Sequence, residues 1–426
     1  MKVLYIALVA FSLAFAFTDI VLRFPRQNHT RQDDWPEFAH LTPKLKRWHK
    51  ENSTIEHDPI NMEERKVTVL DANSRNDLWL STSGFELVDL HPRILSYLRE
   101  IKKNGLVGAR VGPSTAGSNF LLFFSGGSDE VLEDKLARAL QGSDSFSLGN
   151  GKYHYAFRCA GFVIRKGGPE GSKLPGSGFD MVAQRVHIDQ DLDGEPLLSM
   201  GLNWIFKLPF MYMVNIWSPL HDIRMRPMAF ADRRTIHVES DVVRYRANST
   251  QNAGGRLGSF RSDRLMSLYS ERHQWYWYPN VRFGQAIAFD TSNVPHSSFS
   301  IPGEELLSTI RQDILDLKDN PVRKSSLCTQ ETFQITPSEE ISLDMEALIS
   351  SALGFKKRIC ESRGSPNDFD EILDYLTRAS LEIRCVTFVA PSNIAHFIRL
   401  LIFGSGSLFF LFVIRSITRL LCHQRK

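Results

Sequence analysis

The segment Gln184-Arg185-Val186-His187-Ile188-Asp189-Gln190 places a histidine and an aspartate two residues apart in a run that contains β-branched residues. Alternate side chains of a strand point to the same face, so His187 and Asp189 are expected to lie next to each other. Further along the chain, residues 293–297 offer His296 as a third ligand. Two imidazoles and one carboxylate, with the other metal positions open, suit Fe(II) and its oxygen chemistry. The sequence therefore predicts a metal site built from these three residues.

Two other segments carry a histidine followed two residues later by a carboxylate. His237-Val238-Glu239 has the same spacing, and His49-Lys50-Glu51 has it in a polar stretch without a strand signal. In a chain with 13 histidines, a triplet of this kind is expected by chance. Spacing alone therefore leaves His237 and Glu239 open as a rival site.

The composition indicates a folded chain with a substantial core. Of the 426 residues, 42% are hydrophobic, enough to bury a substantial core, and the length allows two or three domains. The net charge of +3 is nearly balanced and no basic stripe with interleaved aromatics is present, so a nucleic-acid partner is not expected. The five cysteines have no C-x-x-C spacing and predict neither a zinc ribbon nor a disulfide framework. They are Cys159, Cys328, Cys360, Cys385 and Cys422.

The two ends of the chain indicate targeting or membrane segments. Residues 1–17 have Lys2 before a long apolar run and resemble a signal peptide, or alternatively an uncleaved anchor. Residues 391–426 contain an apolar stretch at 394–414 followed by a basic tail, which predicts a possible transmembrane helix; a buried terminal helix is the alternative. Membrane association in the secretory pathway or endoplasmic reticulum is therefore expected, with a cytoplasmic location as the alternative.

Between these ends the sequence predicts an arm, a β-rich domain and an insertion. Residues 18–66 are polar and interrupted by prolines, which favours an extended arm. Helices are predicted from Pro92 to residue 104 and from residue 128 to 142. Short strand-like runs follow at residues 155–164, 185–189, 212–217, 228–231, 235–238, 274–278, 286–289 and 381–389. This order predicts an α+β chain around a double-sheet barrel or jelly roll.

Eight segments, in order, resemble a fungal family of hydroxylases and desaturases that is related to cephalosporin methoxylases and gibberellin desaturases. This family is part of the Fe(II)/2-oxoglutarate oxygenase class. The segments are residues 81–87 (STSGFEL), 185–190 (RVHIDQ), 214–220 (VNIWSPL), 226–232 (RPMAFAD), 273–279 (HQWYWYP), 286–290 (AIAFD), 295–299 (PHSSF) and 378–384 (RASLEIR).

The resemblance implies a double-stranded β-helix core at residues 67–302 and 377–390. It also implies that His187, Asp189 and His296 bind Fe(II). Arg378 and Ser380 would bind the distal carboxylate of the co-substrate 2-oxoglutarate, a contact for which the guanidinium fork is well suited. Arg384 and Arg311 compete for that role. The chain departs from the family pattern in the charged insertion at residues 303–376, which separates His296 from Arg378.

The implied reaction couples oxidative decarboxylation of 2-oxoglutarate, with O2, to hydroxylation or desaturation of a small, largely apolar specialised metabolite. Trp275 and Trp277 share one strand face, and Tyr276 and Tyr278 share the other, so one pair is expected to pack the core and the other to line the substrate pocket. Trp275 and Trp277 are taken as the pocket pair, together with Asn215 and Trp217. Two other functions stay open: a catalytically silent, membrane-tethered binding or structural protein on the same fold, and a zinc-dependent hydrolase.

Overall fold

The computed structural model describes residues 17–25, 62–103, 152–169, 185–189, 211–249, 260–319, 324–328, 341–362 and 366–391. The expected signal peptide or anchor at 1–16, the helix at 128–142 and the possible membrane helix at 394–414 lie outside these residues. Within the ranges just given, none of the helices combines the length and the apolar character needed to cross a membrane.

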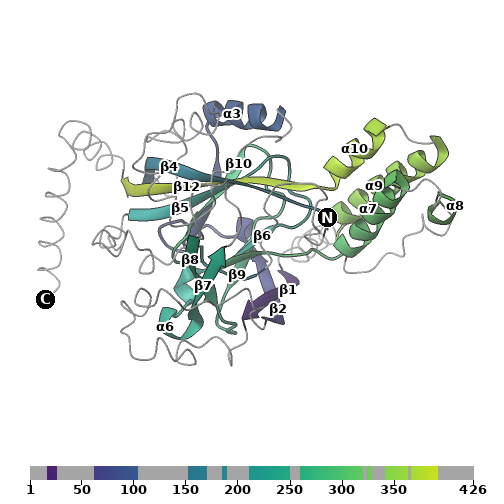
Figure 1. Cartoon of the computed structure of the whole chain (residues 1–426). Helices are drawn as coiled ribbons and strands as arrows, with labels where there is room; N and C mark the ends of the chain where they lie inside the picture. Colours follow the sequence, from purple (N-terminus) through teal and green to yellow (C-terminus); the bar gives the residue numbers. More distant parts are fainter. Residues whose placement is uncertain are drawn as a thin grey trace, which may run out of the picture.

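Two five-stranded sheets form the core of the fold (Figure 1). The first sheet has the order β1(Phe17–Pro25), β2(Met62–Asp71), β9(Trp275–Trp277), β6(Met228–Ala231) and β11(His296–Ser298). The second has the order β3(Phe85–Asp89), β10(Gln285–Asp290), β5(Met211–Pro219), β12(Arg378–Pro391) and β4(Lys152–Gly167). All neighbouring strands are antiparallel except β2 and β9. The chain alternates between the sheets from β9 to β12, so the expected jelly-roll core is confirmed.

The side chains of β12 divide between two environments according to whether their number is odd or even. Ala379, Leu381 and Ile383 belong to an apolar cluster that also contains Ile94 and Leu98 of helix α3(Pro92–Lys103). Alternate residues of a strand point to opposite faces, so residues 378, 380, 382 and 384 face the space between the sheets. That space is filled mainly by apolar side chains, and they come from both sheets: Phe85, Trp217, Phe230, Tyr276, Ile287 and Phe289.

The structure corrects the polar arm that was expected at residues 18–66, because β1 and the first residues of β2 are strands within that range. In β1 the alternate residues Ile20, Leu22 and Phe24 are buried, and Phe24 contacts Trp275 edge to face. The apolar residues after Thr18 therefore belong to a half-buried strand with a period of two, and not to the end of an anchor.

The strand expected at residues 235–238 is also wrong. The chain forms a 3-10 turn at Arg233–Thr235 and a short helix α6 at Val238–Asp241. The carboxylate of Asp232 accepts a hydrogen bond from the backbone N–H of Arg234, and that of Asp241 accepts one from the N–H of His237. These local side-chain acceptors outweigh the β-propensity of the segment.

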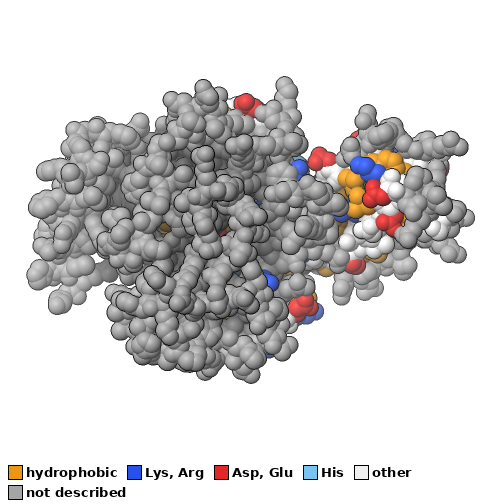
Figure 2. Space-filling model, in the orientation of Figure 1, with side chains coloured by type: hydrophobic (Ala, Val, Ile, Leu, Met, Phe, Trp, Pro, Cys, Tyr) orange, Lys and Arg blue, Asp and Glu red, His pale blue; other side chains and the backbone are white. Residues whose placement is uncertain are grey.

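The insertion between β11 and β12 is helical and has an apolar core of its own. It contains α7(Glu304–Asp319), α8(Lys324–Leu327), α9(Leu343–Ser362) and α10(Pro366–Tyr375), which lie together beyond one end of the strands (Figure 1). Figure 2 shows apolar, acidic and basic side chains mixed on the surface in this part of the molecule.

A disulfide joins Cys328 to Cys360 inside this insertion, and Cys385 of β12 is also disulfide-bonded. The cysteine spacing indicated no disulfide framework, and the structure corrects this interpretation. The two cysteines of the insertion are 32 residues apart in the sequence, yet helix packing brings their Cα atoms within 5.8 Å. Sequence spacing does not reveal a contact that depends on how helices pack.

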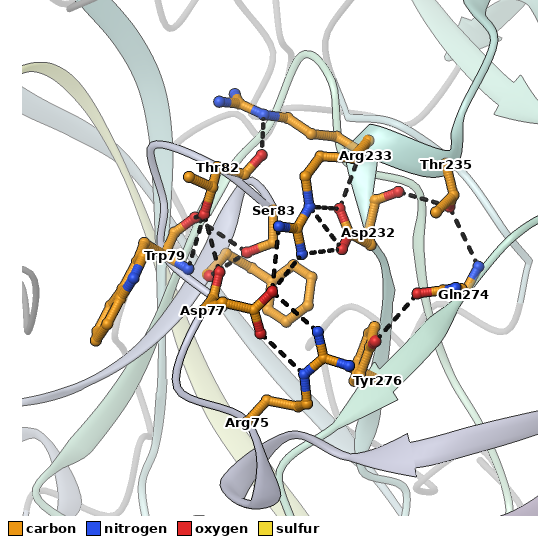
Figure 3. A network of polar contacts seen from close by, with 12 residues as sticks. Arg75, Asp77, Trp79, Thr82, Ser83, Asp232, Arg233, Thr235, Gln274 and Tyr276 are labelled. Carbon is orange, nitrogen blue, oxygen red and sulfur yellow. Dashed lines mark hydrogen bonds and ion pairs between the residues drawn. The ribbon is translucent and has the colours of Figure 1, made fainter.

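A polar network fixes the loop before β3 against the turn at residues 232–235 (Figure 3). Asp77 accepts hydrogen bonds from Arg75, and Arg234 bridges Asp77 and Asp232. Arg233 donates to the backbone carbonyls of residues 81 and 82, at 2.6 and 2.8 Å. This network holds Gly84 directly against Val294, two residues before His296.

Substitution Gly84→Ala tests this contact. Gly84 has a φ of +91°, and a Cβ atom there would lie 2.3 Å from Cγ2 of Val294. We expect a loss of about 2–3 kcal/mol in the free energy of unfolding, measured with urea. The control is Gly354→Ala within α9, where nothing lies within 4 Å of the added Cβ. This change should be neutral or stabilise by about 0.5–1 kcal/mol, and equal losses at both positions would contradict the contact.

Candidate metal centre

The three predicted ligands meet between the sheets. His187, Asp189 and His296 are buried, and their ligand atoms all lie within 4.8 Å of one another. Nε2 of His187 lies 3.4 Å from Oδ1 of Asp189, and Nε2 of His296 lies 3.8 Å from Oδ2. Each histidine therefore points the same ring nitrogen at the carboxylate.

Two backbone hydrogen bonds bring the histidines together. The N–H of His187 donates to the carbonyl of His296 at 3.1 Å, and the N–H of His296 donates to the carbonyl of His187 at 2.9 Å. This antiparallel bridge attaches residues 185–189 to β11. The ring centroids of His187 and His296 are consequently 4.4 Å apart, although the two residues are distant in the sequence.

The other ring nitrogen of each histidine contacts a backbone carbonyl. Nδ1 of His187 lies 2.7 Å from the carbonyl of Arg185, and Nδ1 of His296 lies 3.0 Å from that of Val294. A carbonyl can only accept, so Nδ1 carries the proton and Nε2 keeps its lone pair. Carbonyl partners of this kind orient metal-binding histidines in proteins.

The charges of the cluster also favour a cation. Burial, followed by the neighbouring His187, lowers the pKa of His296 to about 4, so this ring is neutral near pH 7. Burial alone would raise the pKa of Asp189, but Arg384 and the two histidines outweigh it and hold that pKa well below its usual value. Two imidazoles and one carboxylate are the donor set that suits Fe(II) with open positions.

The turn that presents His296 is held by Asp290. Its carboxylate accepts from the backbone N–H and the hydroxyl of Ser292, and from the amide nitrogen of Asn293 at 2.9 Å. Arg233 pairs with the same carboxylate at 3.3 Å. The network around Gly84 is therefore connected to the second histidine through a short, well-bonded turn.

Arg378 and Ser380 face the same interior and have unsatisfied polar atoms. All three guanidinium nitrogens of Arg378 and the hydroxyl of Ser380 are buried without a hydrogen-bond partner among the residues described. The guanidinium lies over the ring of Trp217, 5.0 Å from its centroid, and burial lowers the pKa of Arg378 to about 9. A buried guanidinium without an acceptor is costly, and one carboxylate bound at both ends of its fork would satisfy it. These residues fit 2-oxoglutarate.

The residues predicted to line the pocket fall into two groups. Asn215 and Trp217 of β5 face the metal residues, since Nδ2 of Asn215 lies 3.5 Å from Oδ2 of Asp189. Trp275 and Trp277 do not. In β9 and β6, Tyr276 and Phe230 are register partners on the His296 face, so Trp275 and Trp277 point to the opposite face. Their assignment to the pocket is corrected: they pack in the cluster that contains Phe24 and Phe299.

Sequence spacing did not decide between the pair His187 and Asp189 and the rival pair His237 and Glu239. The local structure does decide. Glu239 lies within α6 and His237 caps it, so the two residues do not share a strand face. Among the residues that the structure places, His187, Asp189 and His296 form the group that could hold a metal. Arg311, a rival of Arg378, lies on α7 in the helical insertion.

Two contacts of the interior face of β12 were not predicted from the sequence. One is the ion pair between Arg165 and Glu382, and the other is the contact of Arg384 with Asp189. Nε of Arg165 lies 2.5 Å from Oε1 of Glu382, and Nη2 of Arg384 lies 3.4 Å from Oδ1 of Asp189. The sequence does carry a signal, because residues 378–385 (RASLEIRC) alternate polar and apolar side chains. The polar half of that pattern is the interior face of β12.

Comparison with known proteins finds one family model and two curated relatives. Residues 162–314 match the family model "Oxidoreductase/YMDC permease-like domain". The chain is 28% identical over 144 residues to alpha-ketoglutarate-dependent dioxygenase tstK of Talaromyces stipitatus. This match covers 29% of this chain and 47% of the relative. It is 28% identical over 159 residues to Gibberellin cluster GA4 desaturase of Gibberella fujikuroi. That match covers 34% of this chain and 38% of that protein.

Each match therefore spans less than half of the curated relative. A solved structure, the iron and alpha-ketoglutarate-dependent endoperoxidase NvfI, superposes with a TM-score of 0.42 at 15% identity, covering 88% of this chain and 98% of that one. The sequence matches confirm the resemblance to fungal 2-oxoglutarate-dependent dioxygenases and desaturases.

Metal retention tests the ligand assignment. Asp189→Ala removes the anionic ligand and His296→Ala removes one imidazole, so each variant should lose the Fe(II) that the wild type keeps through gel filtration. Elemental analysis measures the iron. His237→Ala is the control and should keep the wild-type iron content. Full iron in both ligand variants, with loss in the control, would assign the metal to the rival pair.

Proposed function

We propose that the chain is an Fe(II)- and 2-oxoglutarate-dependent oxygenase that hydroxylates or desaturates a small organic metabolite. The observation that carries the proposal is the buried Arg378 guanidinium beside Ser380, which has no hydrogen-bond partner among the described residues and faces the same interior as the His187, Asp189 and His296 cluster. The two sites together fit a metal and a dicarboxylate. The names of the two curated relatives support the same chemistry.

Each residue group has a distinct role in this reaction. His187, Asp189 and His296 would hold the metal on one side, and Arg378 and Ser380 would bind the distal carboxylate of 2-oxoglutarate. When bound, Fe(II) and 2-oxoglutarate would supply, with O2 as the oxidant, an oxidative decarboxylation to succinate and carbon dioxide that is coupled to hydrogen removal from the second substrate. The aromatic rings around the cluster, including Phe230 and Phe289 against His296, exclude water from the reacting atoms.

Succinate release tests the role of Arg378. Wild-type protein with Fe(II), ascorbate and 2-oxoglutarate should release succinate, and Arg378→Ala should raise the 2-oxoglutarate concentration needed by about 10- to 100-fold. This factor corresponds to the loss of a charge-assisted hydrogen bond. Arg311→Gln, on the helical insertion, is the control and should leave the requirement unchanged.

The three outcomes that would contradict this prediction have different meanings. No succinate from the wild type would refute the oxygenase and favour the silent binding protein. Zinc found in the purified protein, with hydrolysis in place of succinate release, would favour the hydrolase. An unchanged requirement in Arg378→Ala would remove that residue from co-substrate binding while leaving the oxygenase intact.

We also propose that the protein resides in an oxidising compartment of the secretory pathway, in association with a membrane. The disulfide between Cys328 and Cys360 and the bonded state of Cys385 support an oxidising location, because the cytosol keeps thiols reduced. The membrane part of the proposal rests on the apolar residues 394–414. Membrane fractionation of the full chain against a chain ending at Pro391 tests that part.

The thiol state tests the oxidising location. Protein alkylated in intact cells without reductant should show Cys328 and Cys360 unmodified by mass spectrometry. Replacing both by serine should lower the free energy of unfolding by about 2–4 kcal/mol, as expected for loss of a loop-closing disulfide. Replacing Ser351 of α9 by alanine is the control and should change stability little. Full alkylation of both cysteines would instead place the protein in a reducing compartment.

A further inference from the structure

We infer that the second substrate is an organic acid and that Arg384 binds its carboxylate beside the metal. This inference rests on the proposed oxygenase function and adds a substrate class to it. Arg384 lies on the interior face of β12, six residues after Arg378, and its side chain is 7% exposed. Its register partner on β5 is Asn215, which contacts the same carboxylate of Asp189.

The charges of the loaded site leave Arg384 without a counter-ion. The positive charges of Fe(II) and Arg378 equal the negative charges of Asp189 and of the two carboxylates of 2-oxoglutarate. Arg165 and Glu382 neutralise each other as a partly buried pair at 2.5 Å. Of the guanidinium groups on the interior face of β12, Arg384 is then the one with no anion of its own. Arg226 also reaches this interior, where it donates to the hydroxyl of Ser298.

In the absence of a metal, Asp189 is the anion beside Arg384, with 3.4 Å between Nη2 and Oδ1. A carboxylate that donates electron density to Fe(II) neutralises a second cation much less well. A buried, unpaired guanidinium is strongly unfavourable, so a further anion is favoured once the metal is bound. The second substrate is the component of the reaction that has yet to be placed, and a carboxylate on it would supply this anion.

Neighbouring atoms describe the rest of the substrate. Oδ1 of Asn215 is an acceptor and Nε1 of Trp217 is a donor, and both are buried without a partner in the described structure. Phe289, the register partner of Asn215 on β10, contributes an apolar ring that contacts His296. The set fits an acid with an apolar body and a hydroxyl group that can donate to Asn215.

A purely positioning role for Arg384, in which it only orients Asp189, predicts a different result. A positioning residue would change iron retention and would not distinguish a charged ligand from its neutral analogue. The test therefore needs a matched pair of probes that differ in charge. Benzoate and benzamide have nearly the same shape, and only benzoate carries a negative charge.

Binding of the two probes is measured by calorimetry with full-length protein, Fe(II) and saturating 2-oxoglutarate, without oxygen so that no turnover occurs. Wild-type protein should bind benzoate about tenfold more tightly than benzamide, or better, as expected for a charge-assisted contact. Arg384→Gln should abolish this preference. Arg272→Gln is the control, because Arg272 also pairs with an aspartate, Asp241 at 2.8 Å, but at a position away from the metal residues. It should keep the preference.

Several results would overturn the inference. These are equal affinities in the wild type, no binding of benzoate, a preference that survives in Arg384→Gln, or release of radiolabelled 2-oxoglutarate by benzoate, which would place the anion on Arg378. Iron content is measured in parallel. If the preference returns in the Arg384→Gln variant once Fe(II) is raised until its iron content equals that of the wild type, Arg384 is a positioning residue only. Succinate release by the wild type with any of these results would leave the proposed oxygenase standing.

Discussion

The pair of backbone hydrogen bonds between His187 and His296 is the constraint on which the site depends. It joins a short segment, residues 185–189, to β11 and sets the distance between the two imidazoles before any side-chain contact is considered. A shift of one residue in this register would move one histidine to the opposite face. The cluster of ligand atoms within 4.8 Å is thus a consequence of β pairing.

The same period of two allows a charged interior to exist inside an apolar fold. The outward half of β12 packs under α3 and contributes to the free energy of folding. The inward half carries Arg378, Ser380, Glu382 and Arg384, whose burial is costly unless each charge finds a partner. Glu382 has Arg165, and Arg384 has Asp189. Arg378 has no hydrogen-bond acceptor within the described part of the chain. A buried guanidinium without an acceptor is costly, and a bound ligand that accepts its hydrogen bonds is the simplest explanation.

The fold class and the metal ligands could be predicted from the sequence because both depend on local periodicity. His187 and Asp189 follow a strand pattern, and helix α3 begins at Pro92 as expected. Prediction failed where the outcome depends on tertiary packing. Which face of β9 looks inward is decided by its pairing with β6, so the two tryptophans were placed on the wrong side. The link between Cys328 and Cys360 likewise depends on helix packing.

The long insertion between His296 and Arg378 is compatible with an intact site for a physical reason. Loop closure entropy rises only logarithmically with length, so an excursion of this size costs about 2 kcal/mol more than one of ten residues. The insertion also folds on its own apolar core, which offsets that cost. Arg378 then returns to the barrel opposite Gly167 of β4, and the pairing of β12 with β5 continues from Ser380 to Phe388. Strand register, and not proximity in sequence to His296, determines where the guanidinium points, and the helices can vary without moving it.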